Sequence, residues 1–400
     1  MFFSRKTVIC FGALATMSLA AAPAAQASQA APQIAWSTDV GQPIYSTPQI
    51  ENGQLYVTSS QDQGPNIFAL EGATGKILWR YATQGAIAIP PTVGASQVFV
   101  ASDTGDIHFM RALDAKTGFL VWQYTRSKPP ECMCSHAADL AAGMLFTQTD
   151  GHSLYAFAPS GAAPARRLWA FSGDGAKLTA TIAATGLVVF GSADHKLYAL
   201  DAKTGAIRWV AATGYAFAAA PVIAGNIVII GNRGGTLHAY DLQTGKSLWN
   251  FSADGPIDDP AAIQGGTAYM VSEDRNVYAL DVKTGALLWQ SAMADYATAP
   301  PVVRHGEVIV ANRAGDLLAL DAQTGKQVWK TSLDGTPFSQ PFLWRNAVAL
   351  KVGDHAMEAV AADSGKLLWE YSSAAVLTDP VIGPAHLYVA TSSGRLLAID

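Results

Sequence analysis

The chain repeats the phrase Ala199-Leu200-Asp201-Ala202-Lys203-Thr204-Gly205, which is followed four residues later by Trp209, and this repetition predicts the fold. Residues 112–118 have the same sequence, and shorter copies run from Asp241 to Gly245, Asp281 to Gly285 and Asp321 to Gly325. Nine of the ten Trp lie at successive intervals of 43, 43, 47 and then five times 40 residues. These are Trp36, Trp79, Trp122, Trp169, Trp209, Trp249, Trp289, Trp329 and Trp369, and Trp344 alone is outside the series. A fixed period of about 40 residues indicates a repeat architecture.

The residue types within one repeat predict short strands. Runs such as Asn226 to Ile230, Thr236 to Tyr240 and Ser247 to Phe251 are rich in β-forming residues and are bounded by Gly, Asp or Asn. No unit has a ten-residue helical period. Four short antiparallel strands per repeat are typical of a β-propeller blade, so we expect an all-β propeller of four-stranded antiparallel blades.

The two ends of the chain predict how the ring closes. A lone Trp strand, Gln33 to Ser37, begins the repeats, and the last unit stops at Leu396 to Asp400 without one. An N-terminal strand that completes the last blade would remove an open edge. Counting this split blade, the sequence predicts nine units.

The repeated phrase has a structural explanation. Its Asp and Thr can accept hydrogen bonds from turn amides, and its Gly supplies the positive φ of a tight hairpin. A Trp on the outer strand can bury its ring between blades while the indole N–H finds a backbone acceptor. We therefore expect both motifs to build the fold rather than a binding site.

The N-terminus has the order of a secretory signal peptide. Arg5 and Lys6 precede an apolar stretch from Thr7 to Ala20, and small residues end at Ala25-Gln26-Ala27. We predict cleavage after Ala27, a single propeller domain over residues 28–400, and a periplasmic location. No segment is long enough for a confident transmembrane span, and Cys10 lies inside the apolar stretch rather than at the cleavage point, so no lipid anchor is expected.

Charge excludes one class of partner. The chain has 26 basic and 31 acidic residues without a block of like charges, and only 14% of its residues are charged. Nucleic-acid binding is therefore not expected, and we expect a packed, monomeric protein.

The repeated Ala-Leu-Asp-Ala-Lys-Thr-Gly phrase with its Trp resembles the PQQ-like propeller repeat. Quinoprotein dehydrogenases and the BamB-type propellers of the outer-membrane assembly machinery share this repeat, and the resemblance covers essentially the whole mature chain. Members of this family have eight blades, so a ring of eight blades is the alternative to the nine units counted here.

The resemblance implies two different functions. BamB-type propellers are scaffolds of about this length without a cofactor, which implies an exported, non-catalytic protein that docks outer-membrane assembly components through rim loops or blade edges. Quinoprotein dehydrogenases are similar but longer, and they imply an alcohol or sugar dehydrogenase with PQQ and Ca²⁺. The fold alone does not separate these functions.

The predicted channel lining disfavours PQQ. We place the innermost strand of each unit just before its recurrent Pro. These segments are Tyr45-Ser46-Thr47, Ala88-Ile89-Pro90, Cys134-Ser135-His136, Leu178-Thr179-Ala180, Ala218-Ala219-Ala220, Asp258-Asp259-Pro260, Thr298-Ala299-Pro300, Phe338-Ser339-Gln340 and Leu377-Thr378-Asp379. None contains the Arg or Lys that the three carboxylates of PQQ require, although the loop residues Arg126, Lys128, Arg304 and Arg345 are within reach of the channel.

One unit departs from the pattern. Between Trp122 and Trp169 the predicted inner strand reads Cys132-Met133-Cys134-Ser135-His136. Alternation places Cys132, Cys134 and His136 on one face, where they are candidate ligands for Cu(I) or Zn²⁺ in a metal- or redox-handling propeller. A local Cys132–Cys134 disulfide, or simple packing, is the alternative that an exported protein favours.

The remaining candidates are weaker. Asp258 and Asp259 are a candidate pair of Ca²⁺ ligands, but that ion takes six to eight oxygens. The chain contains no C-x-x-C-H haem motif, no G-x-S-x-G, no P-loop and no H-E-x-x-H. No catalytic residue is therefore predicted.

Overall fold

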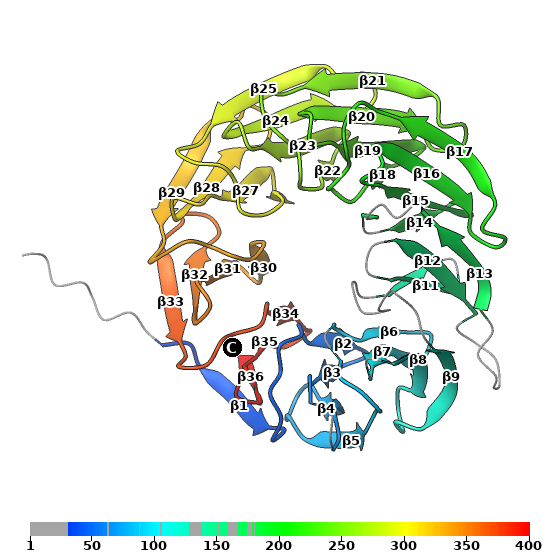
Figure 1. Ribbon diagram of the computed structural model, residues 1–400. Coiled ribbons are helices and arrows are strands. Elements are labelled where there is room, and N and C mark those ends of the chain that lie inside the picture. The colour runs from blue at the N-terminus through cyan, green and yellow to red at the C-terminus, as the bar shows by residue number, and fades with distance from the viewer. Residues whose placement is uncertain are drawn as a thin grey trace, which may run out of the picture.

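The computed structural model describes residues 31–400 except 62–63, 88, 105, 128–137, 142, 150–151, 159–166, 174–177 and 180. Within these residues all regular elements are strands, which form nine four-stranded antiparallel sheets. The sheets are blades around a central opening (Figure 1). The expected all-β propeller is confirmed, and it has nine blades rather than eight in this described part of the chain.

Blades 1 to 8 each use four consecutive strands, ordered from the axis to the periphery. Blade 1 contains β2 (Gln49–Glu51), β3 (Gln54–Thr58), β4 (Ile67–Glu71) and β5 (Ile77–Tyr81), and blade 2 contains β6 (Thr92–Gly94), β7 (Gln97–Asp103), β8 (Ile107–Asp114) and β9 (Leu120–Ser127). Blade 3 contains β10 (Asp139–Ala141), β11 (Met144–Gln148), β12 (Ser153–Phe157) and β13 (Arg167–Ser172), and blade 4 contains β14 (Ile182–Ala184), β15 (Leu187–Gly191), β16 (Lys196–Asp201) and β17 (Ile207–Ala212). Blade 5 contains β18 (Val222–Ala224), β19 (Ile227–Gly231), β20 (Thr236–Asp241) and β21 (Ser247–Ser252), and blade 6 contains β22 (Ala262–Gln264), β23 (Thr267–Ser272), β24 (Asn276–Asp281) and β25 (Leu287–Ala292). Blade 7 contains β26 (Val302–Arg304), β27 (Glu307–Ala311), β28 (Asp316–Asp321) and β29 (Gln327–Ser332), and blade 8 contains β30 (Phe342–Trp344), β31 (Ala347–Val352), β32 (Ala356–Ala361) and β33 (Leu367–Ser372).

Blade 9 closes the ring, as expected. It combines β34 (Val381–Ile382), β35 (Leu387–Ala390) and β36 (Arg395–Ile399) with the N-terminal strand β1 (Ile34–Asp39). β1 runs antiparallel to β36, with Trp36 opposite Ala398. The first and last strands of the described residues therefore lie in one sheet.

The hydrophobic core lies between the blades. Each of the nine buried clusters in the described residues draws on two neighbouring sheets. One cluster joins Ile229 and Trp249 of blade 5 to Met270 and Tyr278 of blade 6. Trp344 is also buried, in the cluster between blades 8 and 9, which assigns the one Trp outside the series to packing.

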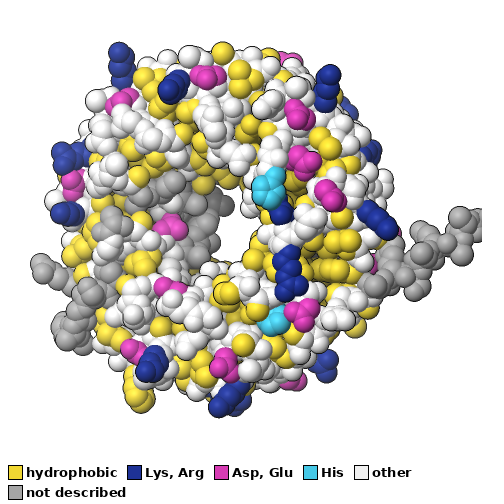
Figure 2. Space-filling model, turned by 180° about the vertical axis from the view of Figure 1, so that it is seen from behind, with side chains coloured by type: hydrophobic (Ala, Val, Ile, Leu, Met, Phe, Trp, Pro, Cys, Tyr) yellow, Lys and Arg dark blue, Asp and Glu magenta, His cyan; other side chains and the backbone are white. Residues whose placement is uncertain are grey.

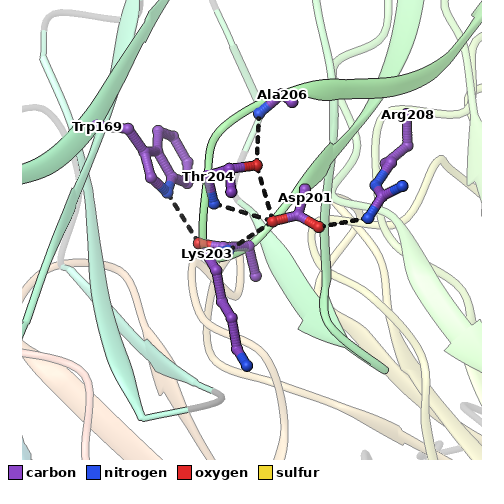
Figure 3. A network of polar contacts seen from close by, with 7 residues as sticks. Trp169, Asp201, Lys203, Thr204, Ala206 and Arg208 are labelled. Carbon is purple, nitrogen blue, oxygen red and sulfur yellow. Dashed lines mark hydrogen bonds and ion pairs between the residues drawn. The ribbon is translucent and has the colours of Figure 1, made fainter.

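The repeated turn of one blade and the repeated Trp of the preceding blade contact each other across the blade boundary (Figure 3). Asp201 Oδ1 accepts hydrogen bonds from the amides of Lys203 (3.1 Å) and Thr204 (2.9 Å). The indole of Trp169 in the preceding blade donates to the Ala202 carbonyl at 2.8 Å. Hydrogen bonds from Arg208 and from the Thr204 amide and hydroxyl lower the pKa of Asp201 to about 2, so this carboxylate remains ionised in its turn.

The predicted position of the inner strands is wrong by a few residues. β2 begins after Pro48 and β18 after Pro221, whereas the predicted segments lie in the connections that enter the blades. Proline has no N–H for a ladder, so regular pairing starts only after it. The connections contribute isolated bridges, such as Phe217 to Asn232.

Candidate interaction surfaces

The meander topology gives the ring two different faces. The entry face carries the connections that lead into the blades and the loops between second and third strands, which bond to one another, as in Arg233 N to Ala216 O at 3.0 Å. The hairpin face carries the first hairpin of each blade and the Asp-Thr-Gly turns, as in Ala202 N to Gly186 O at 2.8 Å. Outside the core between the blades, loop side chains from different blades therefore meet only where they share a face.

The two aspartates singled out in the sequence differ in environment. Asp258 Oδ2 pairs with Arg233 Nε at 3.3 Å. Burial, Asp258 and Glu273 together raise the pKa of Asp259 to about 6. The described residues contain no group of three or more His, Cys, Asp or Glu placed to hold a metal ion, so this pair gains no third such ligand there.

A lysine also lies beside the predicted channel segments. Lys351 of β31 places its Nζ 3.8 Å from Asp379 Oδ1 and 3.5 Å from the Leu377 carbonyl. Burial raises the pKa of Asp379, and Lys351 opposes this shift. Like Arg233, this cation is already paired with an aspartate of the neighbouring connection, and so it is compensated by the protein itself.

The remaining predicted residues are distributed as follows. Cys132, Cys134, His136 and Lys128 lie outside the described residues, so the disulfide and metal hypotheses stay predictions. Arg126 lies on the outer strand β9 and donates to the Tyr155 hydroxyl. Arg304 and Arg345 lie in first hairpins, on the hairpin face.

An open groove of about 720 Å³ lies where β1 completes blade 9. Asp39, Tyr371 and Arg395 line it together with several hydroxyl groups. These groups can form hydrogen bonds, but they include no pairing of a nucleophile with a base.

Three large aromatic side chains are exposed on the entry face. Tyr45 is 62% exposed, and Tyr215 and Phe338 are each 58% exposed. They come from the connections into blades 1, 5 and 8. Tyr45 and Phe338 were predicted to lie in inner strands, so their exposure was not predicted. The signal that could have indicated it is the recurrent Pro, after which regular pairing begins, so that the residues before it belong to the connection.

These observations define a nine-bladed β-propeller built from PQQ-like repeats. The model of the family described as outer membrane protein assembly factor BamB matches residues 26–164, 153–295 and 273–400, and the chain belongs to this family. A search of the curated proteins found no match.

Solved structures confirm the fold. The crystal structure of BamB from Moraxella catarrhalis is similar with a TM-score of 0.61 and 15% identity, covering 92% of this chain and 99% of that one. The computationally designed Ika8 protein is similar with a TM-score of 0.59 and 14% identity, over 90% of this chain and 97% of that one. At this identity the likeness concerns architecture alone.

Proposed function

We propose that this protein is an exported, non-catalytic scaffold that binds protein partners in outer-membrane protein assembly. The family description supports the assembly role. The residue pattern supports a scaffold, because the repeated Asp, Thr, Gly and Trp are engaged within the turns and between the blades.

The observation that carries the proposal is the set of exposed aromatics on the entry face. Tyr45, Tyr215 and Phe338 present large rigid side chains to solvent from connections held by backbone hydrogen bonds. Aromatic residues are enriched in protein interfaces because they bury a large area at a small cost in conformational entropy. The entry face is therefore the proposed docking face.

Site-specific photo-crosslinking tests this proposal. A photoreactive phenylalanine analogue replaces Tyr45, Tyr215 or Phe338 in cells, and mass spectrometry identifies the adducts. Phe119 is the control position, since it is 75% exposed but lies in a turn of the hairpin face. We expect outer-membrane assembly components at the three entry-face positions and not at Phe119; no adduct, or the same adducts at all four positions, contradicts the proposal.

The proposal that the protein is non-catalytic is tested separately. The protein is incubated with PQQ and Ca²⁺, and dye-linked oxidation of alcohols and aldoses is measured. We expect neither tight uptake nor turnover, because Arg233 and Lys351 are already paired with Asp258 and Asp379. Tight uptake with turnover would establish the quinoprotein alternative.

The metal and redox alternative is tested at the cysteines. Zinc and copper are measured in protein purified without chelator, together with free thiols. Bound metal, with loss of function but not of fold in Cys134→Ser, would favour that alternative over a disulfide.

A further inference from the structure

The hairpins between first and second strands are not equivalent around the ring. In blades 1 to 6 they contain no Arg, Lys or His: their sequences are Glu51-Asn52-Gly53-Gln54, Gly94-Ala95-Ser96-Gln97, Ala141-Ala142-Gly143-Met144, Ala184-Thr185-Gly186-Leu187, Ala224-Gly225-Asn226-Ile227 and Gln264-Gly265-Gly266-Thr267. In blades 7 to 9 they carry Arg304, His305, Arg345 and His386, which we call the cationic arc.

Hydrogen bonds connect the arc across three blades. Arg304 donates from Nε to His305 Nδ1 at 3.1 Å and from Nη2 to the Arg345 carbonyl. Arg345 Nη2 in turn donates to the Ala385 carbonyl at 2.8 Å. In Figure 2, dark blue and cyan side chains gather along one side of the central opening, where these blades lie.

The guanidinium of Arg345 is held in position but remains accessible. Its Cζ lies 4.4 Å from the centroid of the buried Trp344 ring, and its side chain is 59% exposed. Arg304 Nη1 is buried and has no hydrogen-bond partner among the described residues, so it cannot reach a partner. The donors that the arc offers to a partner are therefore those of the exposed Arg345 guanidinium.

We propose that the cationic arc binds the carboxylates of an acidic segment of a protein partner. A planar guanidinium fork matches a carboxylate geometrically. Asp400 already places one carboxylate here, with Oδ1 at 2.7 Å from His386 Nδ1 and 4.0 Å from Arg345 Nη2. This inference does not rest on the proposed docking site, because it concerns the opposite face.

A membrane surface suits the arc less well. Glu307 lies in the same hairpin as Arg304, and Asp400 lies beside His386. These two carboxylates balance the two arginines, so the arc has little net charge with which to attract a sheet of anionic lipid. The binding of a single carboxylate depends less on this net charge, because the carboxylate accepts hydrogen bonds directly from the arginine N–H groups.

The test uses substitutions that the backbone tolerates. His305 and Arg345 have φ values of 47° and 52°, in the left-handed region where glycine is unstrained. The double variant His305→Gly, Arg345→Gly therefore removes two members of the arc and should fold normally. Thr185→Gly, at φ 51° in the uncharged hairpin of blade 4, is the matched control.

Fluorescence anisotropy measures the binding of labelled octaglutamate and octaglutamine peptides at about 50 mM salt. We expect the glutamate peptide to bind more tightly than the glutamine peptide, and the double variant to weaken its binding about tenfold. The Thr185→Gly variant should bind like the wild type. Vesicles of phosphatidylglycerol are the second probe, in a sedimentation assay.

Three results would overturn the proposal: no preference for glutamate, unchanged binding in the double variant, or sedimentation with vesicles without binding of the glutamate peptide. Circular dichroism of the double variant separates lost binding from lost folding. Crosslinking at Phe338 in the same variant reports on the entry face, so failure of this inference is distinguishable from failure of the proposed function.

Discussion

Gly285 is a residue on which both repeated motifs depend. Its φ is +70°, and a Cβ at this position would lie 2.5 Å from Cδ2 of the Trp249 ring in the preceding blade. The Trp249 indole also donates to the Val282 carbonyl of the same turn at 2.9 Å. Glycine is therefore required both for the turn and for the close approach of the ring.

Replacing Gly285 by Ala should lower the free energy of unfolding by about 3 kcal/mol. The left-handed φ accounts for about 1–2 kcal/mol of this loss, and displacement of the Trp ring for the rest. Urea denaturation followed by Trp fluorescence measures the change. Gly225→Ala is the control, because it has a φ of +63° but no atom within 4 Å, and it should cost only the backbone part. Equal losses of unfolding free energy in the two variants would show that the close contact between the turn and the Trp249 ring does not contribute.

Asp259 makes stability depend on pH. Its pKa of about 6 is above the ordinary value of about 4, so the folded protein binds this proton more tightly than the unfolded chain. The stabilisation by this group is complete below about pH 4 and is lost as pH rises to about 6.

The variant Asp259→Asn should consequently be more stable than wild type at pH 7.5, by about 1–2 kcal/mol after allowance for solvent screening. At pH 4 the two proteins should differ little. Thermal unfolding at both pH values measures the effect, and Asp254→Asn, an exposed position in the same connection, is the control. A gain at pH 4 equal to the gain at pH 7.5 would show that the charge is not the cause.

At the scale of elements, the outer strands show how the ring limits pairing with other chains. The pairing shifts register just before the Trp, as between Ala279 and Leu280 opposite β25. Leu287 and Leu288 are both exposed there, at 48% and 53%. Bulges at sheet edges discourage edge-to-edge pairing, so partner docking through the faces is favoured over addition of a strand to a blade edge.

The closing strand β1 should be replaceable by a peptide. A chain that begins at Gly41 leaves the edge of β36 unpaired and removes the Trp36 ring that packs on Gly75. We expect a lower midpoint of thermal unfolding and self-association, measured by circular dichroism and size-exclusion chromatography. A synthetic peptide of residues 31–40 should restore both properties, whereas the same peptide with Trp36→Ser should not. Full stability without the peptide would show that closure by β1 is dispensable.

At the scale of the whole molecule, the blades interact mainly with their neighbours. Each core cluster spans one blade boundary, and from Trp169 onwards the marked Trp are spaced by 40 residues. Excision of residues 253–292 joins equivalent positions after β21 and after β25. It should therefore leave a folded ring of eight blades.

We expect this excised protein to be soluble and monomeric, with a midpoint of unfolding several degrees below that of the full ring, because neighbour interactions in repeat proteins are largely local. Size-exclusion chromatography and circular dichroism measure this. Excision of residues 253–272, half a blade, is the control and should prevent folding. Aggregation in both cases would mean that nine blades are required.

Much of the architecture was predictable because it rests on local, repeated patterns. Turn residues, alternating strands and one Trp per unit recur along the chain, and each acts on the next unit in the same way. The inner-strand boundaries were placed wrongly because the segments before Pro48 and Pro221 look like strands but lack regular pairing. The exposure of Tyr45 and Phe338 was missed for the same reason.

The repeats alone predicted an all-β ring closed by its N-terminal strand, because each unit carries its own turn and its own packing residue. They counted nine units and left eight blades as the alternative, and the nine sheets of the structure resolved this. Which side chains meet around the ring became known only from the folded structure. Arg304 and the Arg345 carbonyl are 41 positions apart, and they come together only because consecutive hairpins share a face. Arg233 and Asp258 likewise pair from adjacent blades. Such contacts follow from ring geometry, which no local pattern encodes.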